Sequence, residues 1–180
     1  MTPELIDREL EKYSCGDWLL IQNETNCLEY IIRAANKKGM KIAFNPSPMD
    51  ETVSTLPLEL VDLFLVNEIE GAAVTGKEIT EEITAEFEKL FPNAAVILTL
   101  GKKGSIFKSE KDMLFQPSYC GTVKDTTGAG DTYTGFFIAN YIKGVSPQEC
   151  MRIAAMASTV QISRDGAAIA IPTKQEVLNA

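Results

Sequence analysis

The most informative stretch of the sequence is Asp125-Thr126-Thr127-Gly128-Ala129-Gly130-Asp131, which an apolar stretch with helical spacing, residues 133–142, follows. The glycines let the backbone approach a ligand closely, and the start of a helix supplies unpaired N–H groups and the positive end of a dipole. Together these features predict an anion hole. Asp131 falls in the first turn, where a carboxylate could take a proton from a hydroxyl group while the hole holds a phosphoryl group. The spacing alone leaves a structural alternative open, in which Asp131 caps the helix and the glycines only form a turn.

Strands and helices alternate outward from this stretch. Strands are expected at residues 18–22, 41–44, 62–66, 95–100, 105–108 and 113–116, and helices at 2–13, 24–38, 68–75, 80–91, 129–143 and 147–163, before a short tail that begins at Pro172. Such alternation is typical of an α/β fold with a mostly parallel sheet and helices on both of its faces. No long linker or internal repeat interrupts the pattern, so we expect residues 1–180 to form a single domain.

The composition excludes several kinds of chemistry. The chain has 180 residues, with 17 Lys and Arg against 25 Asp and Glu, which gives a formal net charge of −8. This charge argues against nucleic acid as a partner. The sequence contains no histidine, which excludes Ser-His-Asp and Cys-His nucleophiles and most catalytic zinc sites. The remaining candidates are carboxylates, lysines, hydroxyl groups, backbone dipoles and a hard metal ion.

The cysteines and the apolar runs indicate where the protein resides. The four cysteines, Cys15, Cys27, Cys120 and Cys150, have no Cys-x-x-Cys spacing, and we expect reduced thiols. The N-terminus has no apolar signal-peptide core. No apolar run is long enough for a membrane span, which needs roughly 20 residues. We therefore expect a soluble, cytoplasmic protein with no membrane partner.

Residues 125–131 closely resemble the C-terminal signature of the ribokinase (PfkB-type) family of carbohydrate kinases. Further segments resemble family motifs in the family's order: Asn45-Pro46-Ser47-Pro48, Asn67-Glu68-Ile69-Glu70, residues 96–104 and residues 164–173. The resemblance covers essentially all 180 residues. It implies a three-layer α/β/α fold, and an enzyme that transfers phosphate from MgATP to a hydroxyl group of a small sugar, with ribose and fructose as leading candidates.

The same resemblance assigns the central roles in phosphoryl transfer. Asp131 is then the base that contacts the sugar hydroxyl, and the N–H groups of Gly128, Ala129 and Gly130 stabilise the transferring phosphoryl group. Asn67 lies near the ATP phosphates, and Glu70 organises Mg²⁺ through its waters. Without the family match, Asn67 and Glu70 are interpreted as a helix cap and a solvated acid in the first turn.

The resemblance also implies residues that bind nucleotide, sugar and a cation. Positions beside ATP are Thr99, Gly101, Lys102, Gly104 and Ala155, although Lys102 could equally face water and Ala155 could serve helix packing. Glu24 matches a sugar-contacting acid, with an exposed helix-start carboxylate as the alternative. Some family members hold a monovalent cation such as K⁺ beside the anion hole, and the matching positions are Asp125, Thr127, Arg164, Gly166 and Ala170, mostly through backbone carbonyls.

The resemblance begins partway through the family pattern. The opening strands, their sugar-binding aspartate, a Gly-Gly sugar-contact turn and a small β-sheet lid have no counterpart in the sequence, which we interpret as N-terminal truncation. Uncovered sheet faces would favour self-association, such as a homodimer. Three functions stay open: a sugar kinase represented by part of its sequence, a non-catalytic nucleotide-binding or assembly module built from part of a kinase, and an ATP hydrolase in which water replaces sugar at Asp131.

Overall fold

The computed structural model describes residues 1–180, and the chain divides into two compact units. The first unit comprises Met1–Leu98 and Lys108–Asp112, and the second comprises Thr99–Phe107 and Met113–Ala180. The single domain predicted over residues 1–180 stays a prediction. No helix of the chain has both the length and the apolar character needed to cross a membrane.

The first unit is built on strands that follow one another in the sheet in chain order. Its strands are β1 (Trp18–Gln22), β2 (Lys41–Asn45), β3 (Leu63–Asn67) and β4 (Ala95–Thr99), hydrogen-bonded in the order β1-β2-β3-β4. β1 pairs in parallel with β2, and β2 with β3. Most side chains of β2, β3 and β4 are buried, as expected of strands covered on both faces. β1 ends this order and leaves Leu20 42% exposed, but the predicted self-association stays a prediction.

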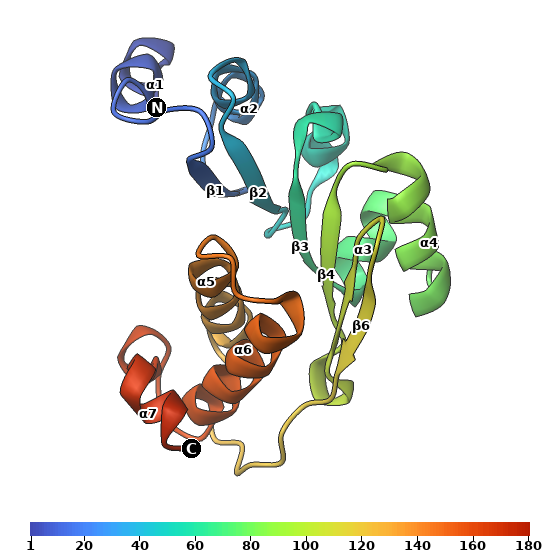
Figure 1. Cartoon of the computed structure of the whole chain (residues 1–180), viewed down its shortest axis with the longest axis vertical. Coiled ribbons are helices and arrows are strands. Elements are labelled where there is room, and N and C mark those ends of the chain that lie inside the picture. Colours follow the sequence, from blue (N-terminus) through green and yellow to red (C-terminus); the bar gives the residue numbers. More distant parts are fainter. The chain divides into compact units, whose positions relative to one another are not determined.

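Helices pack around these strands. They are α1 (Pro3–Leu10), α2 (Leu28–Lys37), α3 (Glu68–Thr75) and α4 (Thr80–Leu90), with short 3-10 helices at Glu51–Thr55 and Leu58–Leu60. α1 packs on α2, and α3 packs on both β3 and α4 (Figure 1). Aromatic rings join α4 to β3: the ring centroid of Phe64 lies 5.2 Å from that of Phe87 and 4.8 Å from that of Phe91. Such ring pairs add to the stabilisation that burial gives.

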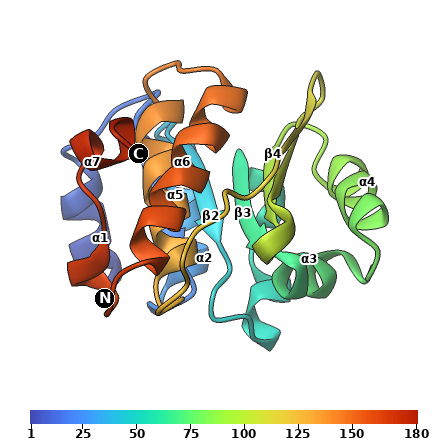
Figure 2. The same cartoon turned by 90° about the horizontal axis from the view of Figure 1, so that it is seen from below.

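The second unit carries the last two strands and three helices. β5 (Ser105–Lys108) neighbours β6 (Met113–Gln116), and α5 (Ala129–Tyr141), α6 (Pro147–Ile162) and α7 (Lys174–Leu178) follow, with 3-10 helices at Gly101–Lys103 and Ala168–Ala170. α5 and α6 lie side by side, and α7 packs on α6 (Figures 1 and 2). Small buried residues of α6, Ala154 and Ala157, allow close helix packing.

Two elements differ from the sequence prediction. α2 begins at Leu28 rather than near Glu24, because Cys27 takes a left-handed conformation with φ 61° and residues 23–26 form a turn. The tail after Pro172 is not simply irregular but contains α7. This helix is held by a capping box, in which the Thr173 side chain accepts from the Glu176 N–H and the Glu176 side chain accepts from the Thr173 N–H.

Candidate functional site

The second unit contains a cleft of about 620 Å³. Its walls come from four segments: the end of β4 with the loop after it, the irregular segment before α5, the first turns of α5, and one face of α6. The lining residues are Thr99, Gly101, Lys102, Gly104, Ser105, Ser118, Tyr119, Cys120, Gly121, Val123, Thr126, Ala129, Gly130, Tyr133, Ala155, Ser158, Thr159 and Ile162. The volume suits a drug-sized or nucleotide-sized ligand.

This cleft gathers residues that the sequence placed on one ligand. Five of the six predicted nucleotide-binding residues, Thr99, Gly101, Lys102, Gly104 and Ala155, line it, whereas Asn67 does not. Ala129 and Gly130 of the predicted anion hole line it as well. The cleft therefore joins the predicted nucleotide loop to the start of α5, while the role of each residue stays a prediction.

The loop after β4 depends on a glycine that no other residue can replace without strain. Gly104 has φ 120°, and a Cβ atom there would lie 2.1 Å from the backbone oxygen of Gln116. The Leu100 N–H donates to the Gly104 oxygen at 2.8 Å, which closes the loop. The turn thus presents backbone and the Lys102 position along one wall of the cleft.

The predicted anion hole lies at the start of α5. Gly128 caps the helix in a left-handed conformation with φ 80°, and no side chain caps this end. The first N–H groups of a helix have no partner within it, and the dipole adds positive potential. One predicted donor is already engaged, since the Ala129 N–H donates to the Thr126 oxygen at 3.2 Å. Asp131 lies in the first turn and is exposed.

The last turns of α6 hold the loop before α5 in place. The Ser158 hydroxyl donates to the Ala129 oxygen at 2.9 Å, and the Gln161 amide donates to the Thr127 oxygen at 2.7 Å. The Lys124 N–H in turn donates to the Ile162 oxygen, near the end of α6, at 2.8 Å. The shape of the predicted anion-hole loop therefore depends on side chains of α6 that lie far along the sequence from the oxygens that they bind.

Sequence reasoning missed three groups of cleft residues, one of which is the irregular segment before α5 with Ser118, Tyr119, Cys120, Gly121 and Val123. Ser158, Thr159 and Ile162 share a helix face with Ala155, at spacings of three, four and seven, so helical periodicity could have found them. The pair of Tyr133 and Ser105 is the third: the Tyr133 hydroxyl lies 2.7 Å from the Ser105 hydroxyl, and burial raises the pKa of Tyr133 to about 12. This pair ties α5 to β5 in the wall of the cleft.

The predicted phosphate-side and sugar-side acids lie in the first unit. Asn67 caps α3: its side chain accepts from the Glu70 N–H at 2.9 Å, and Glu70 Oε2 accepts from the Asn67 N–H at 2.9 Å. The helix-cap alternative is thus present in the structure, but Glu70 is only 7% exposed and is not a solvated acid. Glu24 is exposed in the turn after β1.

One buried carboxylate fits the usual way in which proteins hold Mg²⁺. This ion keeps several waters and needs only one or two carboxylates beside substrate phosphates. No group of three or more acidic or cysteine side chains gathers anywhere in the chain, so an ion held by protein side chains alone does not fit. Glu70 fits the predicted contact through water.

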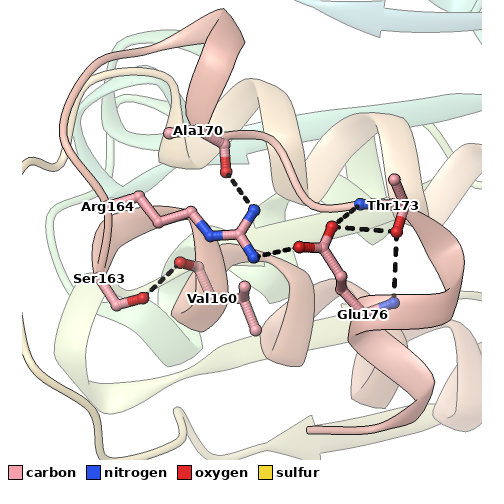
Figure 3. A network of polar contacts seen from close by, with 6 residues as sticks. All are labelled: Val160, Ser163, Arg164, Ala170, Thr173 and Glu176. Carbon is pink, nitrogen blue, oxygen red and sulfur yellow. Dashed lines mark hydrogen bonds and ion pairs between the residues drawn. The ribbon is translucent and has the colours of Figure 1, made fainter.

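The five positions predicted for a monovalent cation are bonded to protein groups. Asp125 accepts from the Thr127 N–H at 2.9 Å and from the Gly166 N–H at 3.2 Å, and the hydrogen bonds from Thr127, with a smaller one from Gly166, lower the pKa of Asp125. Figure 3 shows Arg164 between the Ala170 oxygen, 3.5 Å from its Nη1, and the carboxylate of Glu176. The carbonyls of Thr127 and Gly166 face the Gln161 amide.

Comparison with known proteins places the chain in a family. The sequence profile of the pfkB family carbohydrate kinases matches residues 13–174. The chain belongs to this family. A ribokinase of Haemophilus influenzae is 32% identical, in an alignment that covers 97% of this chain and 59% of the relative. A ribokinase of Arabidopsis thaliana is 30% identical, with 98% of this chain and 49% of the relative covered. The chain thus spans about half to three-fifths of these two pfkB-family relatives.

Solved structures confirm the fold. A ribokinase crystal structure from Thermotoga maritima has a TM-score of 0.84 and 27% identity, and the match covers 99% of this chain and 60% of that one. The structure of Arabidopsis thaliana ribokinase complexed with ribose and ATP has a TM-score of 0.82 and 28% identity, covering 98% of this chain and 57% of that one. The predicted ribokinase-like α/β fold and family membership are therefore confirmed.

Proposed function

We propose that this chain carries the nucleotide and phosphoryl-transfer side of an ATP-dependent sugar kinase, with ribose as the first candidate substrate and fructose as the second. The observation that carries the proposal is one cleft that unites five of the six predicted nucleotide residues with Ala129 and Gly130 at the start of α5. Relatives named ribokinase, one of them solved with ribose and ATP, support the substrate class.

Phosphoryl transfer demands positioning and charge stabilisation more than covalent chemistry from the protein. The adenosine part of ATP occupies the cleft between the 99–104 loop and the α6 face around Ala155, and its phosphates run toward the start of α5. There the N–H groups of the first turn stabilise the charge that develops on the transferring group. Asp131, in the same turn, accepts the proton of the attacking sugar hydroxyl.

Mg²⁺ supplies charge neutralisation on the phosphates when it is bound. Glu70 would hold the ion through its waters, and the Asn67 cap fixes the direction of that carboxylate through a reciprocal pair of hydrogen bonds. Glu24 is the proposed contact to the sugar. Both acids are assigned from the family resemblance, and the burial and hydrogen bonds of Glu70 are compatible with its role.

The test combines binding and turnover on this chain. Calorimetry measures the affinity for a non-hydrolysable ATP analogue with and without Mg²⁺, and ADP release is followed across a panel of sugars. We expect Mg²⁺-dependent binding and ADP release that ribose stimulates. The control is Asp131→Asn, which should lower sugar-dependent turnover by about 10²-fold or more while analogue affinity stays within a few-fold.

Each outcome separates the alternatives. Binding without turnover under any sugar would favour the nucleotide-binding or assembly module. ADP release that no sugar changes would favour the ATP hydrolase. A large residual rate in Asp131→Asn would contradict the base assignment, and absence of analogue binding would contradict the proposed function itself.

A further inference from the structure

A buried carboxamide joins the anion-hole loop to the segment after α6. Gln161 lies in the last turn of α6 and is 0% exposed. Its Nε2 group lies 2.7 Å from the Thr127 oxygen and 3.5 Å from the Gly166 oxygen. An amide nitrogen carries two hydrogens, so one side chain can serve both carbonyls.

The Asp125 carboxylate makes the complementary pair of contacts. It accepts from the N–H of Thr127 at 2.9 Å and from the N–H of Gly166 at 3.2 Å. Thr127 and Gly166 are therefore each held twice. Their N–H groups donate to the Asp125 carboxylate, and their carbonyls accept from the Gln161 carboxamide. The two side chains together fix the separation of the 125–129 loop and the 164–170 segment.

We infer that the Gln161 carboxamide takes the place of the monovalent cation in this chain and organises the anion-hole loop without one. A cation would hold the loop by drawing several carbonyl oxygens toward one point, and the two N–H dipoles of Gln161 do this for Thr127 and Gly166. An ion among these carbonyls would meet the hydrogens of Nε2. Ala170 completes the mismatch: its carbonyl faces the Arg164 guanidinium at 3.5 Å, and its side chain has no oxygen.

The orientation of the amide follows from its partners. Gln161 Oε1 is buried and has no hydrogen-bond partner, an arrangement that costs free energy. Turning the amide over would place Oε1 where Nε2 now lies, 2.7 Å from the Thr127 oxygen, with no proton between the two acceptors. Only a bound cation would stabilise that reversed arrangement. The two orientations therefore make opposite predictions for K⁺.

The inference rests on the proposed function only in so far as the loop is the anion hole, so its test measures stability and not enzymatic activity. The unfolding midpoint of the wild-type chain is measured in KCl and in choline chloride at equal ionic strength, and is expected to be the same in both. Gln161→Ala removes the donors and opens space. Its midpoint should fall by about 5 °C in choline chloride, and KCl should restore most of that loss.

Two further variants serve as matched controls. Gln161→Met removes the donors but fills the space, so its midpoint should fall equally in both salts. Ser158→Ala removes the other hydrogen bond from an α6 side chain to the loop, whose acceptor is Ala129 rather than Thr127 or Gly166, and its smaller loss should also be independent of K⁺. Only Gln161→Ala should distinguish K⁺ from choline.

The result that overturns the inference is a wild-type midpoint that KCl raises above its value in choline chloride, because the ion would then bind with Gln161 present. A Gln161→Ala variant that folds but that K⁺ does not restore would also overturn it, since Gln161 would then be an ordinary buried hydrogen-bonding residue. The wild-type comparison remains decisive if Gln161→Ala does not fold. Because no arm measures turnover, an inactive chain would contradict the proposed function and leave this test intact.

Discussion

Substituting Gly130 can show whether this residue helps to bind the phosphoryl group or only helps to form the turn before α5. It lies in the first turn of α5, and a Cβ atom placed on it would meet no atom within 4 Å outside its own helix and chain neighbours. Gly135, later in the same helix, is equally open. Replacing a helical glycine by alanine stabilises a helix by about 0.5–1 kcal/mol. Both Gly130→Ala and Gly135→Ala should therefore raise the unfolding midpoint, by about 1–4 °C for a chain of this size.

The two variants should differ in function. Gly130 lines the cleft, so a methyl group there would stand between the helix N–H groups and the phosphoryl group, whereas Gly135 does not line the cleft. We expect Gly130→Ala to lower sugar-dependent ATP turnover by about 10²-fold, the effect of losing one donor to a transition-state oxyanion. Gly135→Ala should leave turnover unchanged.

Substituting a third glycine, Gly128, should have the opposite effect on stability. Gly128 takes a left-handed conformation with φ 80°. This conformation costs an L-residue about 1–2 kcal/mol, so Gly128→Ala should lower the free energy of unfolding by that amount. Urea unfolding and coupled ADP-release assays on the three variants check the pattern. Equal turnover in Gly130→Ala and Gly135→Ala would refute the anion hole and leave the glycines as turn formers.

Two other predictions concern the loop after β4 and the C-terminal helix. Gly104→Ala should lower the free energy of unfolding by about 4 kcal/mol, because strained backbone and overpacking combine. Gly101 has φ 53°, and a Cβ atom there would meet no atom within 4 Å, so Gly101→Ala should cost only about 1 kcal/mol in the same urea titration. Hydrogen bonds from the Thr173 N–H, Arg164 and the Thr173 hydroxyl lower the pKa of Glu176 from 4.5 to about 2 (Figure 3). The stabilisation by this carboxylate is therefore complete above pH 4.5 and is lost as the pH falls toward 2. Amide exchange of α7 should be slower in wild type than in Glu176→Gln near neutral pH, and a difference that persists unchanged at pH 2 would contradict the assignment.

Much of the fold could be predicted because apolar periodicity and stop signals agree. The helix Glu68–Thr75 was predicted at its observed bounds, since a polar cap precedes it and Gly76 ends it in a left-handed conformation. α2 was predicted too long because nothing in the sequence shows that Cys27 takes φ 61°. α7 was missed although Thr173 and Glu176 have capping-box spacing, because an element of 5 residues carries too little periodicity to be recognised.

Residues of the candidate site could be predicted where a sequence motif fixes the backbone. They could not be predicted where side-chain packing in the interior decides which groups meet. Thr99, Gly101 and Gly104 could be placed beside one ligand because a strand end and a glycine turn constrain the chain locally. Tyr133 could not, since only the packing of α5 brings its hydroxyl to Ser105. Tyrosine is intermediate between buried and exposed residue types, so the apolar stretch 133–142 did not show which group the Tyr133 hydroxyl would meet.

Gln161 shows why the cation positions could not be judged from their own residue types. A site made of backbone carbonyls needs no particular side-chain chemistry at Thr127 and Gly166, so the residue types there are equally compatible with a bound ion and with none. The deciding residue lies on another element, where a fully buried glutamine has to find partners for its donors. Those partners are the same two carbonyls, at 2.7 and 3.5 Å from Nε2. A buried amide of this kind constrains cation binding more strongly than the ligand positions do, because its N–H dipoles oppose the charge that those oxygens would attract.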